Sequence, residues 1–84
     1  MIDQMQLVHL RREVKTALEL AIVALAPATL LDRLGAAAGL LEALAELPSD
    51  APPVAALASR TAKHAFLALE DWRRWQADHA PAPA

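Results

Sequence analysis

The chain has 84 residues, 56% of them apolar and 21% charged, with a formal net charge of -2 and no cysteine. This length holds a single domain, the slight acidity disfavours a general nucleic-acid binder, and the lack of cysteine excludes disulfides and thiolate metal sites. Because Ala and Leu dominate while Tyr is absent and Phe occurs once, we expect an all-helical protein.

The first expected helix runs from about Asp3 to Leu25 and ends at Pro27. Its apolar stripe steps by three and four residues along the chain. The stripe consists of Leu7, Leu10, Val14, Leu18, Ala21 and Leu25. Because residues 20–26 are apolar all round, we expect the second half of this helix to be the most buried part of the fold.

The second expected helix spans residues 27–47, and Thr29 with Asp32 fits a capping box at its start. Its apolar stripe consists of Leu30, Leu34, Ala37, Leu41 and Leu44. Gly35 and Gly39 lie inside this segment, where each costs about 1 kcal/mol of helix stability. They indicate either a break near Gly35, which we favour, or the close approach of another helix.

The third segment, residues 52–79, follows a proline-rich loop in which Ser49 or Asp50 can cap the helix. Its stripe consists of Val54, Ala58, Thr61, Ala65, Leu69 and Trp72. As one helix it would be about 42 Å long, whereas a compact domain of this size is about 30 Å across. We therefore expect a break within residues 59–64, and the same pressure would kink the first helix within residues 9–12.

These segments predict a compact antiparallel bundle of five or six short helices over residues 1–79, with a spectrin-like three-helix up-down-up bundle as the alternative. The Ala–Pro repeat at residues 80–84 is typical of a linker to a following domain or of a disordered terminus. No basic leader is present, and the longest uncharged stretch, residues 20–31, is too short to cross a bilayer. We expect a cytoplasmic protein that makes no membrane contact.

No residue pattern points to catalysis, a metal or another cofactor. The three histidines, His9, His64 and His79, share no ligand spacing. The two serines, Ser49 and Ser59, fit a helix cap and a helix break better than a nucleophile beside a base. We expect a protein that is not an enzyme.

The tetrapeptide Trp72-Arg73-Arg74-Trp75 interleaves aromatic and basic residues, as single-strand nucleic-acid binders do. Trp72 continues the apolar stripe after Leu69, so we favour a core residue beside a solvated face over nucleic-acid contact. For Trp75, packing against Leu7 or Leu10 and exposure as a partner anchor both stay open.

Charged residues segregate along the chain into groups of one sign. The basic groups are Arg11, Arg12 and Lys15, and Arg60 with Lys63; the acidic group is Glu42, Glu46 and Asp50. Separate patches of opposite sign allow head-to-tail association between copies of one domain. We take these eight residues as candidate partner-binding residues, the alternative being that they merely cover a helical bundle.

Part of the chain, residues 11–47, resembles bacterial caspase-recruitment-like domains of the death-fold class. The matching runs are Leu18-Glu19-Leu20-Ala21-Ile22-Val23-Ala24-Leu25-Ala26-Pro27, Leu30-Leu31-Asp32-Arg33-Leu34 and Ala38-Gly39-Leu40-Leu41-Glu42-Ala43-Leu44. The resemblance implies a six-helix Greek-key bundle and homotypic association. It also implies a role in anti-phage defence, in which fused or operon-encoded proteases are brought together to activate a gasdermin-type pore former.

Two other functions remain open from the sequence. A structural or regulatory dimerisation bundle would use an apolar surface around Trp75 and Leu67, and its association would be insensitive to salt. A DNA-binding helix-turn-helix is the third possibility, which the net charge disfavours.

Overall fold

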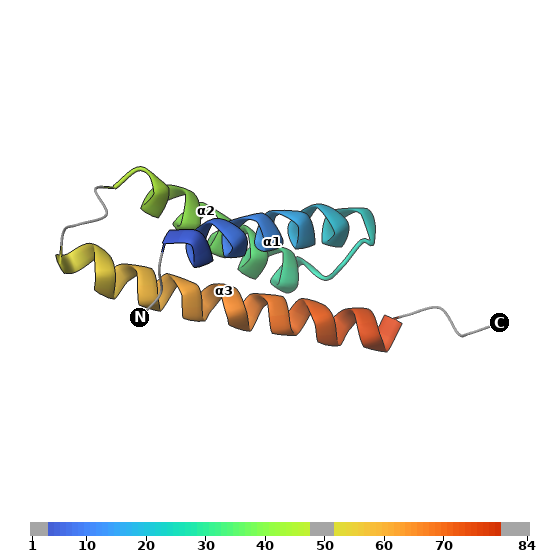
Figure 1. Cartoon of the computed structure of the whole chain (residues 1–84). Coiled ribbons are helices and arrows are strands. Elements are labelled where there is room, and N and C mark those ends of the chain that lie inside the picture. Colours follow the sequence, from blue (N-terminus) through green and yellow to red (C-terminus); the bar gives the residue numbers. More distant parts are fainter. Residues whose placement is uncertain (1–3, 48–51, 80–84) are drawn as a thin grey trace.

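The computed structural model describes residues 4–47 and 52–79. They form helices α1 (Gln4–Val23), α2 (Ala28–Ala45) and α3 (Pro52–His79). The middle helix runs antiparallel to the other two, so the chain passes up, down and up through one bundle (Figure 1). The bundle is elongated, with extents of 51 × 20 × 15 Å along its principal axes.

The prediction of five or six short helices in a death-fold-like Greek key is wrong, and the three-helix alternative describes the architecture. The helix α3 continues unbroken for 28 residues. We expected a break at the polar residues within 59–64. Four of them lie on the exposed side of α3, namely Ser59, Arg60, Lys63 and His64, and the fifth, Thr61, is buried. An elongated bundle accommodates such a helix, so the expected limit on helix length does not apply.

The first helix has no kink, and it ends at Val23, before Pro27. Leu25 takes the left-handed conformation, with φ of 57°. The Ala26 N–H donates to the Ala21 carbonyl at 3.0 Å and the Leu25 N–H to the Ile22 carbonyl at 3.2 Å. These two bonds form a Schellman motif, which ends the helix and satisfies its last carbonyls.

The second helix is continuous through Gly35 and Gly39, so the predicted break is wrong as well. A Cβ atom added to either glycine would meet nothing within 4 Å, so none of the described residues packs closely on them. The N-cap residue is Pro27 and no side chain caps the helix, which contradicts the predicted capping box. Because the buried stripe holds the helix in place by tertiary contacts, the cost of two glycines is tolerated.

The core matches the predicted stripes closely in α2 and α3. All five predicted residues of α2 are buried, and so are the predicted residues of α3 from Ala58 onward. In α1 the expected buried second half is wrong, because Leu25 is 87% exposed and Val23 is 81% exposed. The hydrophobic side chains of residues 20–26 instead surround the turn where α1 ends.

Candidate interaction surfaces

Large apolar side chains are more numerous on the surface of the described residues than in their core. Eleven of them are at least 40% exposed: Met5, Val8, Leu20, Ile22, Val23, Leu25, Leu40, Leu47, Leu57, Phe66 and Leu67. Of the sixteen buried apolar residues, eight are alanine and only eight are larger. Clusters of exposed apolar side chains are typical of surfaces that bind other proteins.

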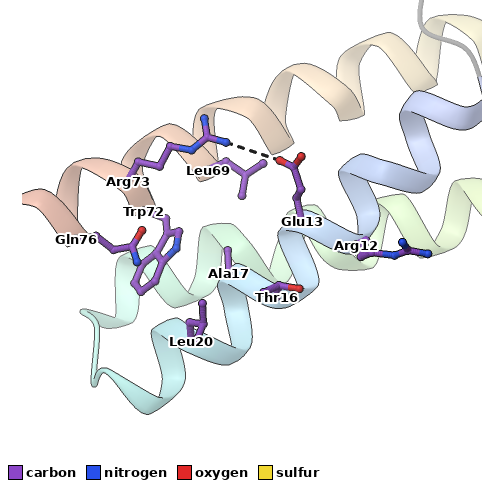
Figure 2. Close-up of a pocket in the computed structure, with 9 residues that line it drawn as sticks. All are labelled: Arg12, Glu13, Thr16, Ala17, Leu20, Leu69, Trp72, Arg73 and Gln76. Atoms are coloured by element: carbon purple, nitrogen blue, oxygen red, sulfur yellow. Dashed lines mark ion pairs between the residues drawn. The ribbon is translucent and has the colours of Figure 1, made fainter.

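A shallow groove separates α1 from α3. Figure 2 shows the Trp72 indole extending from α3 toward Leu20 of α1. An ion pair between Arg73 Nη2 and Glu13 Oε2, at 3.7 Å, bridges the two helices on the same side. Since Trp72 is only 5% exposed, the chain itself already covers the indole, and the exposed apolar surface of this groove includes Leu20, which is 50% exposed.

A larger groove, of about 540 Å³, lies between α2 and α3. Its lining residues are Arg33, Ala36, Ala37, Leu40, His64, Leu67, Ala68 and Asp71. Arg33 forms an ion pair with Asp71 through Nη1 and Oδ2. Leu40 and Leu67 are 42% and 52% exposed, so an apolar surface continues away from this pair.

The structure brings one predicted basic residue together with one predicted acidic residue. Arg11 Nη2 lies 3.4 Å from Glu42 Oε1, because α1 and α2 are antiparallel neighbours. Both side chains stay about half exposed, at 45% and 56%. Lys15 and Glu46, each one turn further along its helix, are also exposed. Of the described members of the two groups, Arg11 and Glu42 therefore meet, whereas Lys15 and Glu46 lie in opposite directions from this pair along the antiparallel chain segments.

The remaining candidate residues are not gathered at one site. Arg12 lines the groove between α1 and α3. Arg60 and Lys63 are exposed on α3. Among the described residues, Arg12, Lys15, Glu46, Arg60 and Lys63 form no ion pair. Asp50 lies outside the described residues.

The two tryptophans stack on one another near the end of α3. Their ring centroids are 5.6 Å apart, and the Trp75 ring stacks on His79 at 4.3 Å. The His79 Nδ1 donates to the Trp75 carbonyl at 2.9 Å. Trp72 is buried as predicted, and Trp75 packs against the core in part. Both rings are thus engaged within the chain, which leaves Leu67 as the exposed member of the predicted surface.

Two other features are absent from the described part of the chain. It contains no group of three His, Cys, Asp or Glu residues that could hold a metal ion. None of its helices has the length and hydropathy that would be needed to cross a membrane.

Sequence reasoning overlooked most of the groove between α2 and α3, although it named Leu67. A usable signal was the spacing of Arg33, Ala36 and Leu40, which recurs outside the core stripe. Exposed leucines at such positions distinguish this row from an ordinary solvated face.

No protein-family model matches the chain, and neither the curated proteins nor the solved structures searched contain a significant match. The resemblance to caspase-recruitment-like domains therefore stands on the sequence runs alone. The three-helix fold lacks the six-helix Greek key that this resemblance implies.

Proposed function

We propose that this chain is a protein-association module that binds helical protein surfaces through the exposed apolar faces of its bundle. The observation that supports the proposal is the placement of its apolar residues. Among the described residues, eleven large apolar side chains lie on the surface, whereas half of the buried apolar residues are alanine. A three-helix bundle that served only as a stable spacer would gain by burying its leucines.

The groove between α2 and α3 is the surface best suited to such binding. Leu40 and Leu67 lie on opposite walls, with Ala36, Ala37 and Ala68 between the charged end and the leucines. The small residues let the backbone of a partner helix approach α2 and α3 closely, and the leucines provide apolar area on both sides of that helix. This arrangement resembles the general way in which an amphipathic helix binds a hydrophobic groove.

Association through separate charged patches receives less support. Arg11 and Glu42 already pair within the chain, and exposed pairs of this kind contribute little free energy. The role in anti-phage defence comes only from the family resemblance, so we confine the proposal to association itself.

Photo-crosslinking in the cells that make the protein tests this function. A photoreactive phenylalanine analogue is placed in turn at Leu40, Leu67 and Phe66, with exposed Lys63 as the matched control position. We expect ultraviolet light to produce defined protein adducts at one or more apolar positions and none at Lys63. The lack of any protein adduct at all three apolar positions would contradict the proposal.

A further inference from the structure

Two rows of residues outside the core follow a heptad spacing along α2 and α3. The row on α2, including the turn after it, is Arg33, Ala36, Leu40, Ala43 and Leu47. The row on α3 is Leu57, Arg60, His64, Leu67 and Asp71. Both rows step by three and four residues, the spacing of helix seams that pack against a partner helix. The four leucines among them are between 40% and 52% exposed.

The two rows are in register with each other. Arg33 pairs with Asp71 at one end of the groove. Leu40, seven residues after Arg33, and His64, seven residues before Asp71, line the same groove. Seven more residues along each row lead to Leu47 and Leu57, by the same spacing. The N–H of Leu47 donates to the Leu44 carbonyl at 3.1 Å, so Leu47 lies in the turn that closes the end of α2.

We propose that a second copy of this chain occupies the face formed by these rows, which we call the α2–α3 face. The inference rests on the proposed association function and names its partner. A two-fold axis parallel to the helices would place α2 of one copy against α3 of the other. The helices α2 and α3 run in opposite directions, and a rotation about an axis parallel to them leaves each direction unchanged. Every helix would therefore be antiparallel to its neighbours in a four-helix core.

This axis matches each layer of the face with the same layer of the second copy. Arg33 of one copy meets Asp71 of the other, and the reverse pair forms by symmetry. Leu40 of each copy meets His64 of the other, and Leu47 meets Leu57 of the second copy. The α2–α3 face is therefore complementary to itself in charge at the Arg33 and Asp71 layer and in apolar character at the Leu47 and Leu57 layer, as a two-fold interface requires.

The size of the face sets the strength of the dimer. Fourteen residues separate Arg33 from Leu47, which gives a length of about 21 Å, and two adjacent helices are about 20 Å wide. Each copy would thus bury about 400 Å², and the pair about 800 Å². This area is below the roughly 1,200–2,000 Å² that specific stable interfaces bury and falls in the range of weak encounters, so we expect a transient dimer with a Kd on the order of 100 µM.

Sedimentation equilibrium of the purified chain tests the dimer between about 1 µM and 1 mM, a range chosen around that Kd. Leu67→Glu places two charges in the apolar core of the interface, and we expect the dimer to disappear over this range. Phe66→Glu is the matched control, because Phe66 is 57% exposed but does not line the groove. Both variants should keep the helical circular dichroism of the parent chain, since each side chain is more than half exposed.

Three results would overturn the inference: a parent chain that stays monomeric up to 1 mM, equal loss of the dimer in both variants, or a dimer that Leu67→Glu leaves intact. If the parent is monomeric but photo-crosslinking yields adducts with another protein, the association function stands and only the second copy is wrong as its partner.

The charged layer gives an independent test of the two-fold arrangement. In the Arg33→Glu chain two acidic residues meet across the axis, and in the Asp71→Arg chain two basic residues do. We expect each variant alone to lose the dimer and an equimolar mixture to recover it as a mixed dimer. A mixture that remains monomeric would refute the pairing of Arg33 with Asp71 of the second copy.

Discussion

Replacing both glycines of α2 with alanine should stabilise the fold. Gly35 and Gly39 lie in the interior of a continuous helix, and a new Cβ atom would meet no neighbour within 4 Å at either position. No steric cost therefore opposes the gain in helix propensity, which is about 0.8–1 kcal/mol per glycine. The double variant Gly35→Ala, Gly39→Ala should gain about 1.5–2 kcal/mol in its free energy of unfolding.

For a domain of this size, such a gain raises Tm by about 6–16 °C. Thermal unfolding followed by circular dichroism, at concentrations that keep the chain monomeric, measures the shift. Ala43→Gly, at an exposed position of the same helix, is the matched control and should lower Tm. A double variant with an unchanged or lower Tm would refute the reasoning, because it would mean that something does pack on these glycines in the folded monomer.

Three further predictions concern the end of α1, the core and the surface charges. Leu25→Gly should raise the free energy of unfolding by about 0.5–1 kcal/mol, as measured by urea titration, because glycine adopts the positive φ without strain and Leu25 buries little area. The control is Val23→Gly, two residues earlier and within the helix, which should not raise this free energy. Leu34→Ala should cost about 2–5 kcal/mol, since Leu34 is fully buried, and a native-like urea midpoint would contradict its central place. Arg11→Ala should change stability by less than about 1 kcal/mol, because its pair with Glu42 is half exposed, and a larger loss in thermal unfolding would assign that pair a structural role.

The periodicity of the sequence predicts which residues form the core of α2 and α3. Leu30 and Leu41 in α2, and Ala65 and Trp72 in α3, are buried as their spacing indicates. The same reasoning fails at the end of α1, where every residue is apolar and no periodicity tells one side from another. Leu25 lies there on the exposed outside of a turn because a Schellman motif ends the helix before Pro27.

The number of helices could not be derived from local signals. A domain about 30 Å across would have to be nearly spherical, whereas three helices can pack side by side with one of them longer than the others. Glycine and polar clusters lower helix propensity by about 1 kcal/mol per residue at most. Burial of a single leucine contributes about 1.5–3 kcal/mol, which outweighs that cost, so α2 and α3 stay continuous.

The α2–α3 face was hidden in the sequence for a related reason. Beside the apolar row that packs in the core, each of these helices carries a second row with exposed leucines, turned about a quarter of the circumference away. Leu40 and Leu41 are adjacent in the chain, yet Leu41 is 3% exposed and Leu40 is 42% exposed. A sequence pattern assigns both to one broad apolar stripe, and only the position of the neighbouring helix separates them. An apolar stripe wider than one neighbour can cover is therefore the physical basis for expecting a second partner on this bundle.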